Sequence, residues 1–538
     1  MKPRVVLALA LLVLALGTAR AALPTWAELQ TAGARIGLIT VATQDIFDTS
    51  DPEEDRWLFR WANRLHVHTR PEVIARALLF KTGDVLSVRV LEETERLLRT
   101  NRYLYDVNIV PVAWRDGVVD IEVRTRDTWS LEPGASVGRS GGTNSKSYAL
   151  REHNLLGTGI SLSWGFSKNV DRSGTDFSFF NERAFGSAAT MAFSHADNSD
   201  GKRSEVSLLK PFVALDTRWA AGVTALQDQR IESLYLRGEL VAEYRRRLQT
   251  AELQGGWSTG LREGWVRRTT LGLALRDDRY ALEPGRPAPA QLATDQRQLG
   301  PFVRLDWIED RVLREVNRNL VGKPEFFALG LVASVQLGWA AQALGSSRDA
   351  FTFDASIARG FEPMAGDMLV VAARWSGQGA EAAPVRQRWR AQMQLYHPQG
   401  PHWLFYGAAA ADRLVDPEPN ETLLLGGDNG LRGYPLRYQS GSRRVLLTAE
   451  ERFYTDLFPW RLFRLGGAAF VDAGRAWGGA SAVAATTAPW LANAGLGLRI
   501  VSARAAFSNV LHLDLAMPLN TSADLKKLQI LVKTKASF

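Results

Sequence analysis

A glycine-rich stretch around one arginine contains the residue types in this sequence best suited to specific chemistry. Residues 426–437 read GGDNGLRGYPLR, with Arg432 between Leu431 and Gly433 and with Tyr434 behind them. Glycine adopts backbone angles closed to other residues, so the stretch can turn tightly without being a helix or a strand. An arginine held in such a loop presents five donors in a rigid fork, which suits a pair of carboxylates.

Two carboxylates follow this stretch, each inside an apparent strand. Glu450 lies in TAEERFY, and Asp472 lies in AAFVDAGRAW. Asp472 alternates with the apolar Val471 and Ala473, so its side chain is predicted to point away from the apolar face of the strand. We expect Arg432 to pair with Asp472 and to lie near Glu450. Taken by itself, the arginine stretch also fits an exposed surface loop.

Other chemistry has weaker support. Residues 134–138 (GASVG) fit the G-x-S-x-G pattern, but a nucleophile elbow needs a helix after the strand, and a loop and another strand follow here. His66 and His68 have no further ligand at metal-binding spacing. No phosphate-binding or dinucleotide-binding motif is present. We therefore expect no enzymatic activity, no metal and no cofactor.

Composition and the first residues indicate export from the cytoplasm. Residues 1–21 combine Lys2 and Arg4, an apolar run and an Ala-x-Ala pattern, which predicts a secretory signal peptide. The 538 residues include no cysteine, so no disulfide can form. The net charge is +8, but the basic residues are scattered singly, without the basic and aromatic cluster of a nucleic-acid surface. We expect no nucleic-acid partner.

Residues 22–127 mix strand and helix patterns. Apolar residues at helical spacing, with a proline in the first turn, predict a helix over 70–80, and a second helix is predicted over 87–99. The other predicted elements are strands at 37–47, 105–114 and 118–126, the last two joined by an Asp116-Gly117 hairpin turn. The order strand, helix, helix, strand, strand predicts one small α+β domain.

Residues 128–538 show short runs with period-two alternation and no helix pattern. Apolar and polar residues alternate in 160–166, 351–357, 389–395 and 528–538, for example. Runs of about 9–11 residues with one apolar and one polar face predict a transmembrane antiparallel β-barrel. A soluble β-sandwich is the alternative, but about 400 residues of such strands is a great deal for one sandwich. The alternation gives about twenty strands, some of which could be halves of one bent strand.

Two family resemblances follow from these motifs. FKTGD followed by ETERLLRTNRYLYDVNI resembles a polypeptide-transport-associated (POTRA) domain, with residues 49–68 as an extra segment that has no assigned role. The barrel region resembles the BamA/TamA superfamily of outer-membrane assembly and translocation proteins. Leu431-Arg432-Gly433-Tyr434 matches its loop-tip motif, and residues 470–474 (FVDAG) match its F-x-D-x-G strand. Residues 450–452, residues 152–159 and the C-terminal aromatic Phe538 resemble further family features.

The resemblance implies a fold. It implies sixteen strands, with an inward-folded loop around 413–443 between the eleventh and twelfth. Five strands should then follow the loop, and the alternating runs after it are 444–454, 465–473, 492–501, 508–517 and 528–538. The last of these should pair weakly with the first strand, 130–138, because Pro133 removes a ladder donor and Gly134 and Gly138 weaken a strand.

The resemblance also implies a function: insertion or translocation of polypeptides at the outer membrane of a Gram-negative bacterium. Residues 22–127 would then be a periplasmic POTRA domain that captures the polypeptide at a strand edge within 105–126. Outer-membrane lipids and the barrel assembly machinery would be further partners, the latter reading Phe538 during biogenesis. A passive porin-like channel and an exporter of a lipid-like substrate are the alternatives.

Overall fold

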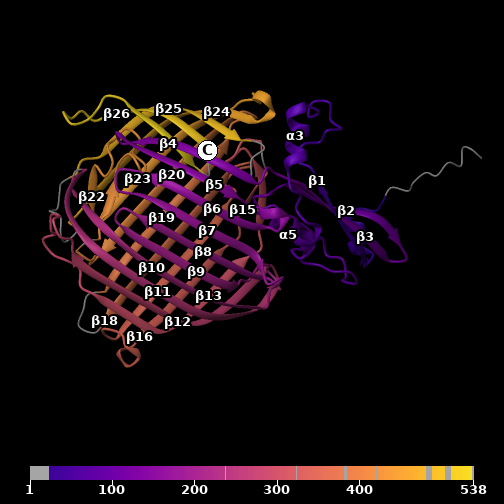
Figure 1. Cartoon of the computed structure of the whole chain (residues 1–538), viewed down its shortest axis with the longest axis horizontal. Helices are drawn as coiled ribbons and strands as arrows, with labels where there is room; N and C mark the ends of the chain where they lie inside the picture. The colour runs from indigo at the N-terminus through magenta and orange to yellow at the C-terminus, as the bar shows by residue number, and fades with distance from the viewer. Residues whose placement is uncertain are drawn as a thin grey trace, which may run out of the picture. The chain divides into compact units, whose positions relative to one another are not determined.

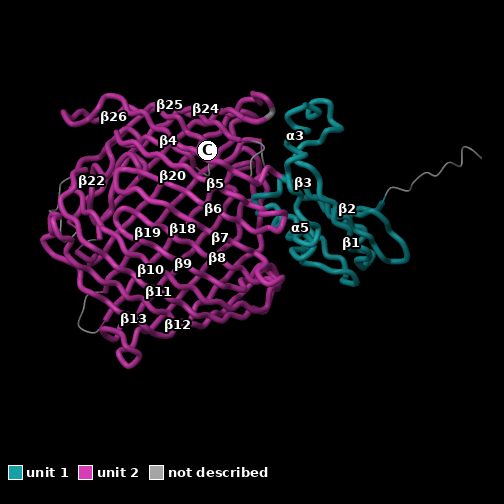
Figure 2. Tube along the Cα trace, viewed as in Figure 1, with its two compact units in different colours: residues 1–127 teal, residues 128–538 magenta. Residues whose placement is uncertain are grey.

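The chain forms two compact units, residues 1–127 and residues 128–538 (Figure 2). The computed structural model describes residues 23–236, 238–322, 324–380, 385–419, 421–479, 488–502 and 510–535. The expected signal peptide and Phe538 lie outside these ranges. No helix within them is long and apolar enough to cross a membrane.

The first unit is a three-stranded sheet packed against short helices. Its elements are α2 (Trp26–Thr31), β1 (Arg35–Gln44), α3 (Trp57–Leu65), α4 (Pro71–Ala75), α5 (Val88–Leu98), β2 (Leu104–Arg115) and β3 (Val118–Asp127). The strand order is β1-β3-β2, with β1 parallel and β2 antiparallel to β3. Asp116 and Gly117 both have positive φ, as the predicted hairpin turn requires.

The core of the first unit explains one difference from the predicted helices. The helix expected over 70–80 ends at Ala75, whereas α5 matches its predicted range within a residue at each end. Ile74 and Phe80 are buried in one cluster with Leu91, Leu98 and the sheet. The helix α4 therefore ends before Phe80, and Phe80 packs into the core from outside the helix. Tertiary packing overrides local helix propensity here.

The second unit is a closed antiparallel barrel (Figure 1). Within the described residues its strands are β4 (Leu131–Ser140), β5 (Thr143–Glu152), β6 (Ile160–Lys168), β7 (Ser173–Ala184), β8 (Ala189–Asn198), β9 (Gly201–Lys210), β10 (Trp219–Leu236), β11 (Glu239–Arg262), β12 (Trp265–Leu282), β13 (Gln296–Glu309), β16 (Val332–Ala340), β17 (Ala350–Phe361), β18 (Met368–Ala380), β19 (Arg386–Pro398), β20 (Trp403–Val415), β23 (Arg443–Tyr454), β24 (Phe463–Trp477), β25 (Leu491–Ser502), β26 (Val510–Pro518) and β27 (Gln529–Lys535). Short 3-10 turns occupy Leu155–Gly157, Gln342–Leu344 and Pro459–Arg461.

The described barrel has twenty strands, the number that the alternation predicted. The sixteen strands implied by the resemblance are too few for this chain. The arginine loop lies between β20 and β23, the fifteenth and sixteenth barrel strands, so the four additional strands precede it. Five strands follow the loop, as expected.

Alternation gives the barrel an apolar outside and a polar inside. Large apolar side chains are exposed on its outer face, among them Trp164, Leu253, Leu273, Leu496 and Ile530. Charged side chains at inward positions are buried instead, such as Asp472, Arg499 and Asp514. This distribution suits a barrel with lipid outside and a polar lumen.

Three strands are longer than the predicted runs. β10, β11 and β12 contain 18, 24 and 18 residues, whereas about 9–11 cross a bilayer. Ion pairs lie near the ends of these strands that are remote from the start of β4. The guanidinium of Arg246 on β11 donates two hydrogen bonds to the carboxylate of Asp278 on β12, at 2.8 and 2.7 Å. These strands therefore continue into water. We call the barrel end where β4 begins the proximal rim and the end where β4 finishes the distal rim.

Candidate functional site

The arginine loop, residues 416–442, connects β20 to β23 and folds into the barrel. Short strands β21 (Leu423–Leu425) and β22 (Gln439–Gly441) pair with each other and bracket its tip. Gly430 has φ 127°, and a Cβ at Gly433 would lie 2.7 Å from the Cβ of Asn493 on the wall. Glycine at these positions therefore permits both the turn and the close approach of the loop to the wall.

The tip residues are fixed on the inside of the barrel. The side chains of Leu431 and Tyr434 are fully buried, and the Tyr434 hydroxyl lies 2.9 Å from the Ala492 carbonyl oxygen and 2.6 Å from Asn520 Oδ1. The Gly433 amide donates to Asn493 Oδ1 at 3.2 Å. The loop tip is therefore held by β25 and the turn after β26, and it is not an exposed surface loop.

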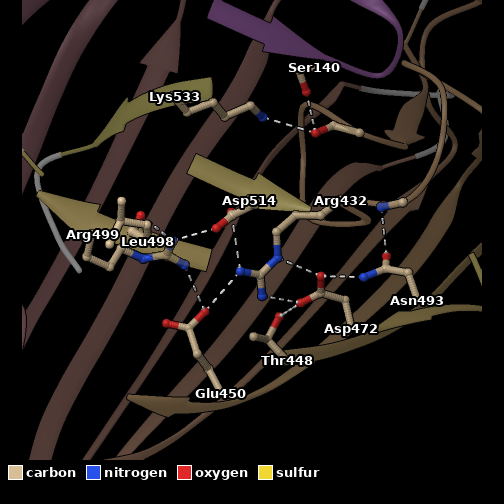
Figure 3. Close-up of polar contacts among 12 residues, drawn as sticks. Ser140, Arg432, Thr448, Glu450, Asp472, Asn493, Leu498, Arg499, Asp514 and Lys533 are labelled. Carbon is tan, nitrogen blue, oxygen red and sulfur yellow. Dashed lines mark hydrogen bonds and ion pairs between the residues drawn. The ribbon is translucent and has the colours of Figure 1, made fainter. Parts of the chain in front are cut away.

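Arg432 lies between two carboxylates of neighbouring strands (Figure 3). Its Nε and Nη2 donate to the two carboxylate oxygens of Asp472, each at 2.8 Å, and its Nη1 donates to Glu450 Oε2 at 2.9 Å. The guanidinium carbon lies 3.3 Å from the ring centroid of Phe470. Arg432 is 8% exposed and Asp472 1%, so both charges are withdrawn from bulk water.

Three further residues complete the Arg432–Asp472 pair and its surroundings. Thr448 Oγ1 and Asn493 Nδ2 each donate to Asp472 at 2.9 Å, and Asp514 lies 3.7 Å from the Arg432 guanidinium. Burial disfavours the charge on Arg432, but the hydrogen bonds and charges of Asp472, together with the nearby carboxylates, outweigh it. The pKa of Arg432 is therefore raised above its ordinary value.

The complete cluster holds three positive and three negative side chains: Arg432, Arg452, Arg499, Glu450, Asp472 and Asp514. Arg499 Nη1 lies 2.5 Å from Asp514, and Arg452 Nε donates to Glu450 Oε1 at 3.0 Å. Each charge thus has an opposite neighbour, as burial of ions requires. Loss of one partner leaves another charge buried and uncompensated.

Sequence reasoning missed Arg499, Asp514 and Asn493. The signal was available, because Arg499 stands between the apolar Leu498 and Ile500, and Asp514 between Leu513 and Leu515. A charged residue at an inward position of an apolar strand faces the lumen, where it needs an opposite charge.

The arginine loop also reaches the seam between the first and last strands. Ser140 Oγ of β4 and Lys533 Nζ of β27 both donate to the Gly427 carbonyl oxygen, at 2.6 and 3.0 Å (Figure 3). Within the described residues, β4 and β27 pair in register only through Arg139 and Val532. The loop therefore bridges the two strands of a seam whose described residues form one registered pair.

A second segment enters the lumen from the proximal rim. The proximal hairpin, β14 (Val312–Val316) and β15 (Pro324–Ala328), connects β13 to β16. Its tip is fixed by Glu325, whose carboxylate accepts from the backbone amides of 318, 319 and 320. The hairpin segment was not singled out in the sequence, because its short runs resemble barrel strands.

The proximal hairpin packs against the wall on the side of the arginine loop. Its residues Val321 and Leu329 share a buried cluster with Met368, Tyr396, Leu404, Tyr454, Val501 and Val510. Tyr396 Oη donates to Asn319 Oδ1 at 3.0 Å. Arg452 Nη1 donates to the Arg318 carbonyl oxygen at 2.7 Å.

Glu450 therefore connects two inserted segments. Its Oε2 accepts from Arg432 of the arginine loop, and its Oε1 accepts from Arg452, which in turn donates to the proximal hairpin. A change at this carboxylate can reach both segments through direct contacts.

The other sequence candidates take no part in this site. The G-x-S-x-G stretch lies within β4, where Ser136 contacts Ser147 Oγ at 2.8 Å and no helix follows. His66 pairs with Asp127, and His68 with Asp45. Across the described ranges, no three metal-ligating side chains are grouped for an ion.

A closed antiparallel barrel with an apolar outside, a charged inside and an inward-folded loop is the architecture of an outer-membrane β-barrel protein. The Omp85 superfamily domain matches residues 154–531. The chain belongs to the Omp85 superfamily, which confirms the resemblance indicated by the loop and strand motifs. Its members are transport and assembly proteins of the outer membrane.

The chain is similar to solved structures of proteins from three bacteria. BamA from Haemophilus ducreyi lacking POTRA domains 1–3 is 13% identical, with a TM-score of 0.39, over 92% of this chain and 85% of that chain. CdiB from Acinetobacter baumannii is 14% identical (TM-score 0.44; 94% and 73%), and CdiB from Escherichia coli is 14% identical (TM-score 0.47; 94% and 76%). No curated protein matches the chain.

Proposed function

We propose that this protein inserts or translocates polypeptides at the outer membrane, with residues 22–127 as a periplasmic POTRA domain and the barrel as a gated passage. Membership of the Omp85 superfamily supports the general role. The proximal rim would then face the periplasm. Arg432, Leu431, Gly433 and Tyr434 form the loop tip, with Glu450 and Asp472 as its lumen partners.

The observation that carries the proposal is the seam between β4 and β27, where the Gly427 carbonyl oxygen of the arginine loop accepts hydrogen bonds from both strands. A barrel that only conducts solutes needs a continuous hydrogen-bond ladder around its circumference. Here, in the described residues, one registered pair joins β4 to β27, and the Gly427 carbonyl oxygen accepts a hydrogen bond from each strand. Withdrawal of the loop would release Ser140 and Lys533 together. The freed strand edges could then template an incoming strand.

The occupied lumen supports this function over that of a passive porin. A porin keeps an open, water-filled channel. In this barrel the arginine loop and the proximal hairpin both enter the lumen, and Arg452 and Tyr396 hold the hairpin tip. Opening would require the movement of at least one of these segments.

We propose β2 as the strand that captures the polypeptide, whereas the sequence indicated either of the two strands in 105–126. β3 pairs on both sides, so of the two strands in 105–126 only β2 has a free edge. Two backbone groups of that edge are occupied by α5 side chains. The Ile109 amide donates to Glu95, and the Val107 carbonyl accepts from Arg99. We propose that an extended polypeptide displaces these two α5 side chains as it adds to β2.

A disulfide across the seam tests the proposal in this cysteine-free chain. Arg139→Cys and Val532→Cys are in register, where paired residues lie about 5 Å apart and can form a disulfide. The matched control joins Ser136→Cys to Ser147→Cys across β4 and β5, which already pair firmly. The assay follows the folding of a urea-unfolded small outer-membrane barrel protein into liposomes that contain each variant.

We expect the reduced seam variant and both forms of the control to accelerate folding of the probe, and the oxidised seam variant to lose that activity. Full activity of the quantitatively oxidised seam variant would overturn the use of the seam. Failure of the unmodified protein to accelerate folding, together with release of entrapped lipid-like solutes, would overturn polypeptide insertion in favour of a non-protein exporter.

A further inference from the structure

The segment 49–68, inserted between β1 and α4, presents a helix with an unpartnered aromatic face. Within it, α3 (Trp57–Leu65) reads WLFRWANRL. Trp57 is 73% exposed, Trp61 53% and Leu65 52%. These residues recur at every fourth position, so they lie along one side of the helix. Exposed tryptophans in such a row mark an interaction surface.

The opposite side of α3 is fixed to its own domain, so the aromatic face is held outward. Phe59 is buried and stacks on Phe47 with ring centroids 4.0 Å apart and planes within 2°. Asn63 makes two hydrogen bonds to the backbone of Phe47, at 3.1 and 2.8 Å. The helix is therefore a rigid part of the first unit, and its exposed side is not a product of fraying.

Basic residues lie beside the aromatic face. Arg56, Arg60 and Arg64 are exposed, and Arg60 and Arg64 fall on the flank next to Trp57 and Trp61, where Arg60 also pairs with Asp55. Tryptophan and leucine on one side with arginine beside them is the pattern of helices that lie in a membrane surface. The rings occupy the headgroup boundary there, and the guanidinium groups contact lipid phosphates.

Chain connectivity keeps α3 within reach of the membrane that holds the barrel. His66, the residue after α3, bonds through Nε2 to Asp127 Oδ2 at 2.8 Å, and Thr69 also donates to Asp127. Only three residues separate Asp127 from Leu131, where β4 begins. The four residue-to-residue steps span at most about 14 Å when extended. This covalent connection limits the distance between Asp127, to which the residue after α3 is bonded, and Leu131, whatever the orientation of the unit.

We propose that α3 docks on the anionic lipid surface of the membrane in which the barrel sits, and that this contact orients the first unit. A single short helix gives weak, reversible binding by itself. The covalent connection to the barrel supplies a high local concentration, so weak contact is enough. This inference requires only that the barrel is in a membrane and does not rest on polypeptide transport.

The test uses the full-length protein in lipid nanodiscs and a nitroxide on Leu58→Cys, an exposed position on the apolar side of α3. Nitroxide relaxation by oxygen and by a water-soluble nickel chelate reports whether the label lies in lipid or in water. The control label is Lys81→Cys, an exposed position in the turn before α5. Nanodiscs contain either phosphatidylcholine alone or phosphatidylcholine with phosphatidylglycerol.

We expect the label on α3 to enter lipid in the anionic nanodiscs and the label at 81 to stay in water. Arg60→Gln with Arg64→Gln should lower the ratio of membrane-bound to free α3 by about 30-fold. Trp57→Ser with Trp61→Ser should also release it, without unfolding, because both side chains are exposed. A label on α3 as accessible to water as the control in both lipids overturns the proposal. So does a label that becomes shielded only after an unfolded barrel protein is added, which would make α3 a polypeptide-binding surface.

Discussion

Ser140 near the end of the first barrel strand and Lys533 in the last donate to the same acceptor, the carbonyl oxygen of Gly427. These two residues belong to strands whose register contains one pair in the described part of the chain. A loop that arrives from between β20 and β23 therefore contacts both strands of the seam. Conditions that move the loop are expected to change the seam.

Removal of both donors should loosen the seam. With Ser140→Ala and Lys533→Met, we expect a broader distribution of spin-label distances between Val137→Cys and Ile530→Cys, two exposed outward positions of β4 and β27. Dipolar broadening of the continuous-wave spectrum, which is sensitive to the short separations between neighbouring strands, measures this distribution. The label pair 515 and 530 is the control, because these residues are in register between β26 and β27. Equal broadening of both pairs would contradict a latch specific to the seam.

Arg432→Ala and Asp472→Ala should destabilise the loop to similar degrees. Each leaves one buried charge without its bidentate partner, a change that costs about 3–5 kcal/mol. Urea unfolding in detergent measures the loss of stability. Protease sensitivity of residues 424–437 reports whether the loop has loosened. Arg443→Ala is the matched control, since Arg443 is exposed at the start of β23. A loss as small as the control's would show that the pair does not hold the loop.

Glu450→Gln should loosen two segments that are far apart in sequence. The amide keeps the shape of the side chain but removes the charge that faces both Arg432 and Arg452. Amide hydrogen exchange should therefore rise in the arginine loop and in the proximal hairpin. Asn319→Ala, which removes only the contact with Tyr396, should raise exchange in the hairpin alone. Exchange confined to the loop in Glu450→Gln would exclude coupling through this carboxylate.

Glu95→Ala with Arg99→Ala should expose the edge of β2. Both side chains occupy backbone groups that an added strand would need, so their loss should strengthen binding of an extended peptide. Fluorescence polarisation of a labelled apolar peptide with the full-length protein measures the affinity. Arg96→Ala on the same helix serves as the control, because Arg96 makes no bond to the β2 edge within the described part of the chain. Weaker binding by the double variant would mean that Glu95 and Arg99 contact the peptide directly.

Local pattern in the sequence determined the architecture and the inward-facing residues. Period-two alternation predicted the barrel and about twenty strands, and the structure contains twenty in its described part. The alternation of Val471, Asp472 and Ala473 placed the carboxylate toward the lumen, where Arg432 meets it. These inferences succeeded because side-chain direction in a strand is a local property that depends only on neighbouring residues.

Contacts between distant segments were decided by the tertiary structure. The resemblance implied sixteen strands, but the structure has twenty in its described part. The motifs that carry the resemblance lie near the end of the chain and give no information on the number of strands before them. The weakening of the seam by Pro133, Gly134 and Gly138 stays a prediction, because their register with β5 concerns the other edge of β4. In the described residues, the register between β4 and β27 contains one pair, Arg139 with Val532. Register between chain ends depends on closure of the whole barrel, which no local pattern encodes.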